Sequence, residues 1–375
     1  MLAPPVSEPS AYSSAGVDYQ TLDAGKRDAL SLALSTSGLL ELHGASARDE
    51  SRGEPAFVFE LGDRAFAFVL ECLGTKSVIA RQVQEQLGLI AFDAVAYDTV
   101  AAVVNDLCCV GALPLVVNAY FATGSSDWYA DRARHESLLA GWLEACRDAG
   151  AAWGGGESPS LSGLVAAGDI ELAGCAIGAV PEHRRPILGA ELAAGDEIVF
   201  VASTGLHANG ASLARKTAAR LADGYATRLP SGRALGEALL DRSANYVPLV
   251  RALMNADVPV HYLSHLTGHG LLKLMRPRRE LGYEIETLSV VPEVLELLVD
   301  HNDLSPAQAY STFNMGSGFA VYCAAGHGEE VAEIARATGH QAHVAGAVTG
   351  GPRRVVLAAI DVVFETEDMD LGPRA

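Results

Sequence analysis

Short apolar runs alternate with amphipathic stretches in the first half of the chain. Residues 56–59 and 65–70 are apolar enough to predict two strands separated by a turn. Between 92 and 109, apolar residues recur at helical spacing, which predicts a helix. The other elements predicted in this half are strands at 116–121 and 170–180, a helix at 132–149 that ends before Gly150, and a loop at 154–157.

The second half shows the same alternation. Its predicted elements are strands at 197–201, 319–323 and 355–360, helices at 212–221, 236–255 and 329–338, and a loop at His265. Because the strands are short and mixed with helices, the pattern predicts an α+β fold of two domains rather than one doubly wound sheet. A polar, proline-flanked segment at 181–186 marks the boundary. We therefore expect a leader and first helix at 1–40 and domains at 41–184 and 185–375.

Composition agrees with two globular domains and narrows the choice of partner. The chain has 375 residues, of which 49% are apolar and 19% charged. Its formal charge is 27 minus 46, or −19, so nucleic acid and anionic membranes would be repelled. Residues 1–16 form a loose leader without an export signal, which predicts a cytoplasmic protein. The uncharged stretch 107–126 contains Gly111, Pro114 and Asn118, so it is expected to be buried in the protein rather than in a membrane.

A polar turn follows the second predicted strand. Gly74 permits a tight backbone, Thr75 offers a hydroxyl, Lys76 a cation and Glu71 a carboxylate. This set is suited to a phosphate and a metal ion, although the spacing is not that of a Walker A loop. An ordinary turn remains the alternative.

The predicted helix at 92–109 carries acidic and amide side chains on an otherwise apolar surface. Asp98 and Asn105 are seven residues apart and share one face, with Asp106 beside them. A buried carboxylate requires a partner or a cation. Magnesium bound together with ATP phosphates meets that requirement, and so does a helix cap or a buried salt bridge.

Four further glycine-rich segments carry candidate chemistry. Gly155 and Gly156 would let backbone amides approach an anion while Glu157 reaches a metal, unless this stretch is a plain hinge. His207, Asn209 and Gly210 precede a helix whose amides would suit a phosphate. His265 and Thr267 lie in a second histidine-containing stretch suited to proton transfer or to capping, and Asn314 lies in the fourth. Together the segments predict a composite site between the domains.

These motifs resemble, in order and over nearly the whole chain, those of the aminoimidazole ribonucleotide synthetase family, also called phosphoribosylformylglycinamidine cyclo-ligase. The similar segments are YSSAGVD at 12–18, GTK at 74–76, VNDL at 104–107, YFATG at 120–124, GGES at 155–158, HANGASLARK at 207–216, HLTGHG at 265–270 and TFNMGSG at 312–318.

The resemblance implies an ATP-binding N-terminal domain whose sheet forms a homodimer, and a C-terminal substrate domain. It implies that ATP, with magnesium, phosphorylates the formamide oxygen of formylglycinamidine ribonucleotide before a nitrogen closes the imidazole ring. It also implies roles for individual residues: catalysis by Glu71 and His265; nucleotide binding by Gly74, Thr75, Lys76, Asp98, Asn105, Asp106, Gly155 and Gly156; metal binding by Glu71, Asp98 and Glu157; and ribonucleotide binding by His207, Asn209, Gly210, Thr267 and Asn314.

Several positions depart from the family pattern. Glu71-Cys72 stands where Asp-Gly is usual, His269 replaces a glycine, and the segments 159–161 and 242–245 also differ. Two alternatives therefore stay open. One is another ATP-using enzyme of the same superfamily, such as a thiamine-phosphate kinase, a selenophosphate synthetase or a hydrogenase maturation protein. The other is a non-catalytic dimer that senses nucleotides.

Overall fold

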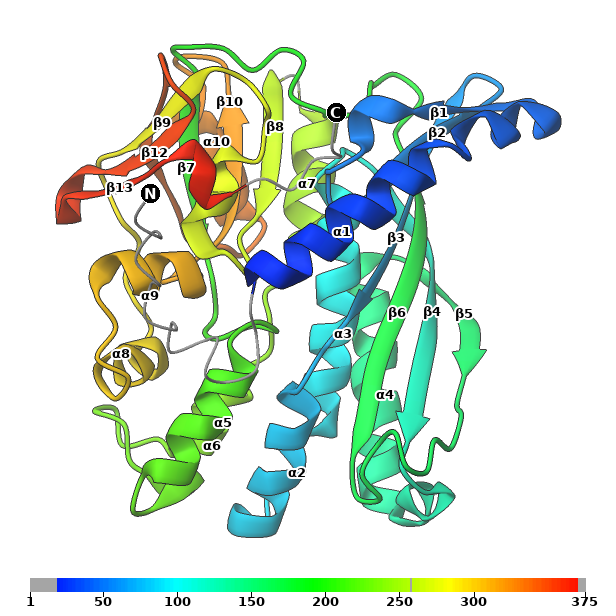
Figure 1. Cartoon of the computed structure of the whole chain (residues 1–375), viewed down its shortest axis with the longest axis vertical. Helices are drawn as coiled ribbons and strands as arrows, with labels where there is room; N and C mark the ends of the chain where they lie inside the picture. Colours follow the sequence, from blue (N-terminus) through cyan, green and yellow to red (C-terminus); the bar gives the residue numbers. More distant parts are fainter. Residues whose placement is uncertain (1–18, 257, 370–375) are drawn as a thin grey trace, which may run out of the picture.

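The chain folds around two β-sheets, one in each half (Figure 1). The computed structural model describes residues 19–256 and 258–369. The predicted leader at 1–16 and the motif at 12–18 lie outside the described residues. Because each half combines a mixed sheet with helices, the predicted α+β fold of two domains is confirmed.

The N-terminal sheet has the strand order β1-β2-β3-β6-β4-β5, in which β4 and β5 pair in parallel and the other neighbours are antiparallel. Its strands are β1 (Ala45–Arg48), β2 (Phe57–Leu61), β3 (Arg64–Cys72), β4 (Leu113–Thr123), β5 (Ala152–Glu157) and β6 (Ile170–Ala179). The helices of this half are α1 (Tyr19–Leu34), α2 (Lys76–Leu87), α3 (Phe92–Cys108) and α4 (Arg132–Ala149), with 3₁₀ helices η2 (Ser37–His43), η3 (Asp49–Ser51) and η4 (Ser126–Ala130).

The two faces of this sheet differ in burial. On β3, Ala67 and Val69 are buried on the face that α3 covers, whereas Phe68 and Leu70 alternate with them and are exposed. Figure 1 shows α3 and α4 side by side along the covered face. The opposite face therefore presents apolar side chains to solvent in a single chain.

The glycine-rich stretch 154–157 is a strand, not the predicted loop. It forms most of β5, which pairs in parallel with β4. A Cβ on Gly154 would lie 2.4 Å from Asn118 Oδ1, and one on Gly156 would lie 2.0 Å from the Ala119 carbonyl oxygen. The glycines are required here by the close approach of β4, so this part of the sequence encodes packing within a sheet.

The C-terminal sheet has the order β13-β12-β9-β11-β7-β10-β8, with β12 and β9 parallel. Its strands are β7 (Glu197–Ala202), β8 (Val260–His265), β9 (Leu281–Ile285), β10 (Ser317–Cys323), β11 (Ala342–Gly350), β12 (Arg354–Leu357) and β13 (Val362–Phe364). The helices are α5 (Ala211–Arg220), α6 (Leu235–Leu239), α7 (Val247–Asn255), α8 (Glu293–Asp300), α9 (Pro306–Thr312) and α10 (Gly328–Ala337), with 3₁₀ helices η5 (Gly224–Ala226), η6 (Gly270–Met275), η7 (Ala358–Ile360) and η8 (Thr366–Asp368).

Three predictions for this half were wrong in detail. The helix predicted at 236–255 is divided into α6 and α7, because the backbone between them bonds to side chains of α3 and Pro248 lies in the first turn of α7. His265 is the last residue of β8, paired with Phe319, rather than part of a loop. The last predicted strand ends at Leu357 and continues as η7.

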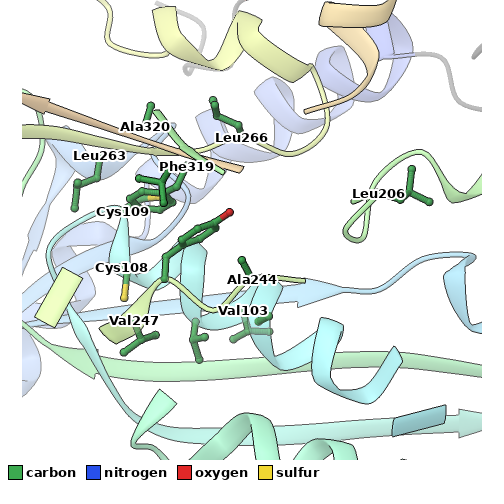
Figure 2. Close-up of a cluster of buried hydrophobic side chains, with 14 of the residues drawn as sticks. Val103, Cys108, Cys109, Leu206, Ala244, Val247, Leu263, Leu266, Phe319 and Ala320 are labelled. Atoms are coloured by element: carbon green, nitrogen blue, oxygen red, sulfur yellow. The ribbon is translucent and has the colours of Figure 1, made fainter. Parts of the chain in front are cut away.

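Helix α3 joins the two halves. Nearly all of its side chains are buried, because it packs on β3, β6 and α4 on one side and on α7 and β8 on the other. Figure 2 shows Val103 and Cys108 of α3 in one buried cluster with Val247, Leu263 and Phe319 of the C-terminal half. This continuous core fixes the polar side chains of α3 relative to the C-terminal loops.

The uncharged stretch 107–126 lies in the end of α3 and in β4, as predicted from its glycine and proline content. Within residues 19–256 and 258–369, no helix has both the length and the apolar character needed to cross a membrane.

Candidate active site

A pocket of about 740 Å³ lies between the two halves, and we call it the central pocket. The N-terminal half contributes residues 71–75, where β3 turns into α2, and Asp106 from α3. The C-terminal half contributes 208–212 at the start of α5, the end of β8 at His265, and 267–269. Three of the predicted polar segments therefore meet in one pocket, as expected for a composite site.

Glu71 enters the pocket from the end of β3. Burial and the neighbouring Asp106 carboxylate, to which it is hydrogen-bonded, raise the pKa of Glu71 to about 7, and the positive charge of Lys273 only partly offsets this. Glu71 therefore exchanges a proton near neutral pH, which is the property required of a general acid or base.

His265 and Asp106 form a buried pair across the domain interface. His265 Nδ1 lies 2.6 Å from Asp106 Oδ1, and the exposed fractions of the two residues are 4% and 8%. Burial lowers the pKa of His265 below its usual value even though Asp106 acts in the opposite direction. Burial acts to raise the pKa of Asp106, but the hydrogen bond with His265 and the nearby charges of His265, Lys273 and Arg276 together lower it below its usual value. A neutral imidazole that donates Nδ1–H to Asp106 leaves Nε2 free to accept a proton.

Lys273 and Arg276 also line the pocket, although the sequence analysis did not identify them. Lys273 Nζ donates to Thr267 Oγ1, and Thr267 itself lines the pocket. Burial and the positive charge of Arg276 lower the pKa of Lys273 to about 8, while Asp106 and Glu71 act against this shift. A single lysine within the apolar run 270–275 was the signal that would have identified it.

Lys76, Asp98 and Asn105 hold the domains together and do not line the pocket. Asp98 Oδ2 lies 2.5 Å from Lys76 Nζ, and both side chains have no exposed surface. Asp98 Oδ1 accepts the Ser243 amide at 2.6 Å. Asn105 bonds to the Ala244 carbonyl and the Tyr246 amide at 2.9 and 2.8 Å. Of the roles left open for Asp98, the structure shows the buried salt bridge.

Two residues that were predicted to bind the ribonucleotide, His207 and Asn314, are buried and do not line the central pocket. His207 Nε2 accepts the Thr204 amide at 3.1 Å, and burial together with the charges of His265 and Lys76 lowers its pKa well below the usual value. Asn314 Oδ1 accepts from Ser203 Oγ and the Gly316 amide at 2.8 and 2.9 Å. Both side chains shape the loops, whereas Asn209 and Gly210 reach the pocket.

The predicted metal ligands are not gathered in one place. Glu157 lies exposed on β5 and outside the central pocket, and Asp98 is occupied by Lys76. Among residues 19–256 and 258–369, no group of three or more His, Cys, Asp or Glu side chains is arranged to hold a metal ion. The structure does place Glu71 beside Asp106. From the sequence, Asp106 was predicted to bind the nucleotide rather than a metal ion.

Both halves of the chain match known families. Residues 53–180 match the N-terminal domain of the AIR synthase related proteins, and residues 193–358 match the C-terminal domain. A phosphoribosylformylglycinamidine cyclo-ligase from Methanobrevibacter smithii is 33% identical over 75% of this chain and 79% of its own. The chain belongs to the AIR synthase related family. A cyclo-ligase from Methanothermobacter thermautotrophicus is 31% identical over 93% of this chain and 97% of its own.

The fold of the AIR synthase related family also occurs in enzymes with other substrates. Thiamine monophosphate kinase from Aquifex aeolicus superposes with a TM-score of 0.55 at 14% identity, over 80% of this chain and 90% of that enzyme. At this identity the likeness concerns the fold alone, so the residues of the central pocket must decide the activity.

Proposed function

We propose that this family member is a cytoplasmic enzyme of purine biosynthesis that uses ATP to convert formylglycinamidine ribonucleotide to aminoimidazole ribonucleotide. The observation that carries the proposal is the central pocket, in which His265, Asp106 and Glu71 converge from both halves. Relatives named as cyclo-ligases, at 31–33% identity over most of the chain, support the same reaction.

The chemistry follows from the leaving group. A formamide oxygen leaves poorly, but a phosphorylated oxygen leaves as inorganic phosphate. Transfer of the ATP γ-phosphate to that oxygen therefore prepares the carbon for attack by the neighbouring nitrogen, which closes the ring. The protein has to position the two substrates and manage protons, which are the contributions that a pocket of fixed side chains makes best.

His265 and Glu71 are the proposed catalytic residues. The neutral His265 Nε2 accepts the proton of the attacking nitrogen, and Asp106 holds the imidazole in that tautomer. Glu71, whose pKa in the metal-free pocket is raised to about 7, is suited to exchange a proton near neutral pH. Lys273 lines the same pocket and is suited to supply positive charge to a phosphate group.

Two carboxylates side by side fit a magnesium ion. Glu71 and Asp106 repel each other when both are ionised, and the charge of a divalent cation that these two residues would hold would offset that repulsion. Magnesium commonly binds one or two carboxylates together with substrate phosphates, so it needs no third protein ligand. When bound, it would neutralise charge on the transferred phosphate. The predicted contacts of Gly155, Gly156 and Glu157 with nucleotide or metal stay predictions.

The start of α5 suits the phosphate of the ribonucleotide. Gly210 has a φ of 97°, and a Cβ at this position would lie 2.6 Å from Phe313, so glycine is needed for the loop to enter the helix here. The first residues of α5, Ala211 and Ser212, line the pocket next to Asn209. Unpaired amides at a helix start attract an anion.

We also propose that the enzyme is a homodimer joined through the open face of the N-terminal sheet. Phe68, Leu70 and Leu115 on that face are 45%, 66% and 46% exposed. Apolar side chains gathered on one sheet face favour burial against a second copy. Light scattering of the wild-type protein should give twice the chain mass, and Leu70→Lys should reduce it to one chain.

The activity test uses purified protein with formylglycinamidine ribonucleotide, ATP and magnesium. We expect equal amounts of ADP and aminoimidazole ribonucleotide. Thiamine phosphate and selenide, each with ATP, serve as controls for the other enzymes of this fold. ADP release with one of these and not with the ribonucleotide would replace the proposal by that activity, and release with none would favour the nucleotide sensor. Complementation of a purine auxotroph that lacks this step tests the same proposal in cells.

A further inference from the structure

A second pocket lies on the other side of Arg276 from the central pocket. It has a volume of about 840 Å³ and is formed by the strands β1 to β3, the linker at 180–190 and the segment 276–279. We call it the arginine pocket. Its volume is within the range of sites that bind small organic ligands. Nothing in the proposed reaction uses it.

The arginine pocket is basic in an acidic protein. Eight arginines and five acidic residues line it, so its formal charge is 8 minus 5, or +3, whereas the whole chain carries −19. The arginines are Arg48, Arg52, Arg64, Arg184, Arg185, Arg276, Arg278 and Arg279. The central pocket, by contrast, has three basic and three acidic residues and a formal charge of 3 minus 3, or zero. A concave surface with this charge raises the local concentration of small anions.

Some of these arginines donate hydrogen bonds to backbone carbonyl oxygens around the pocket. Arg184 donates to the carbonyl oxygens of Met254 and Ala256 at 3.0 and 2.5 Å. Arg279 donates to the carbonyl oxygens of Gly189 and Leu192. These bonds fix the linker and the 276–279 segment, so the pocket is built before a ligand arrives.

Other arginines in the pocket have donors left for a ligand. Arg64 lies over the ring of Phe66, with its Cζ 5.7 Å from the ring centroid, and Arg185 is exposed on the linker. Within the described part of the chain, neither has a carboxylate in salt-bridge range. Arg52 uses one donor within the protein, since its Nη2 donates to Ser37 Oγ at 3.0 Å, and its Cζ lies 4.1 Å from the centroid of Phe57. Within the described residues, its Nε is buried and lacks a hydrogen-bond partner.

We propose that the arginine pocket binds the diphosphate group of a small phosphorylated molecule. The planar guanidinium donates in pairs to phosphate oxygens, which makes arginine the side chain best suited to this group. Arg64, Arg185 and Arg52 approach from three separate segments, so a ligand with two linked phosphates can contact more of them than a single phosphate can. Glu54 and Arg276 line both pockets, which places the bound diphosphate next to the active site.

The test is calorimetric titration of the full-length protein with pyrophosphate, without magnesium. We expect binding to the wild type and a loss of about tenfold or more in affinity for the double variant Arg64→Gln/Arg185→Gln, because two charge-assisted contacts are removed. The matched control is Arg132→Gln/Arg228→Gln, which removes the same charge from surfaces outside both pockets. This control should bind as the wild type does.

A third variant separates the arginine pocket from the central one. His265→Ala should keep wild-type affinity for pyrophosphate, and the Arg64→Gln/Arg185→Gln protein should keep wild-type turnover of the ribonucleotide. Equal affinity in all variants, no binding at all, or a loss caused by His265→Ala would each overturn the proposal. Tighter binding of orthophosphate than of pyrophosphate would overturn the assignment of a diphosphate. ADP binding that is weakened by the arginine variant would identify a nucleoside diphosphate as one source of the group.

Discussion

Two carboxylates on α3, Asp98 and Asp106, lie eight residues apart and have different surroundings. Asp98 is completely enclosed and is neutralised by Lys76 and the Ser243 amide. Asp106 keeps 8% of its surface exposed, reaches the central pocket and bonds to His265. Both contacts of Asp98 are made inside the protein and its side chain does not line the central pocket, whereas Asp106 lines the pocket, where a ligand can reach it.

The comparison teaches that an acidic residue on an apolar helix is not in itself a functional residue. Both carboxylates meet the requirement that a buried charge be compensated. They differ in whether the compensating partner is a fixed cation or a titrating imidazole next to a pocket. Substitutions in the two regions should therefore act on different quantities, stability at Asp98 and turnover at Asp106.

The largest effect is expected from Asp98→Ala. Removal of one partner leaves Lys76 buried and unpaired, which should lower the free energy of unfolding by about 3–5 kcal/mol. Denaturant titration measures it. The double variant Lys76→Met/Asp98→Leu removes both charges and should recover most of the stability. A single variant as stable as the wild type would show that the ion pair is not needed for the domain interface.

His265→Ala should leave the protein folded and lower turnover by about 10²-fold or more, because the proposed proton acceptor is lost. Steady-state production of aminoimidazole ribonucleotide, corrected for the folded fraction, measures this. Turnover equal to that of the wild type would remove His265 from the mechanism.

Glu71→Gln should change how stability depends on pH. The folded-state pKa of Glu71 is raised to about 7 from 4.5, so the folded state holds this proton more tightly than the unfolded state. The free energy of unfolding should fall as pH rises from about 4.5 to 7, and the variant should lack this component, being more stable above pH 7 by about 1–3 kcal/mol. Parallel slopes for both proteins in that window would contradict the raised pKa.

The smallest effect on stability is expected from Arg242, which forms partly exposed ion pairs near the buried Asp98. Arg242 forms ion pairs with Asp93 and Glu144, each at 2.8 Å, and its side chain is 33% exposed. Solvent screens such pairs, so Arg242→Ala should cost about 1 kcal/mol or less and leave turnover unchanged. A cost as large as that of Asp98→Ala would mean that the ion pairs of Arg242, rather than the buried pair, join the domains.

Most of the fold could be predicted from periodicity, and the errors have physical causes. The helix at 132–149 and the strands around 65–70 and 170–180 were correct because one face of each is buried by its own half. The division at 240–246 was missed because the partners of that backbone are Asp98 and Asn105, which are more than a hundred residues away in sequence. The strand at 152–157 was missed because its glycines are specified by β4 and not by local preference.

The site could be predicted as a set of segments but not as a set of contacts. Glu71, Gly74, Thr75, Asp106, Asn209, Gly210, His265 and Thr267 all line the central pocket. Lys76 and His207 are adjacent to such residues in sequence, yet their side chains point into the interior and bond there. At the end of a strand or the start of a helix, neighbouring side chains point in different directions, so one lines the pocket and the next is buried in the interior. Composition carries no signal for this difference.

The most direct test compares Asp98→Asn with Asp106→Asn, two identical chemical changes on one helix. Turnover of formylglycinamidine ribonucleotide per folded molecule should stay within about threefold of the wild type for Asp98→Asn and fall by about 10² for Asp106→Asn. Equal losses in the two variants, or a larger loss at Asp98, would contradict the division of α3 into a structural and a catalytic end.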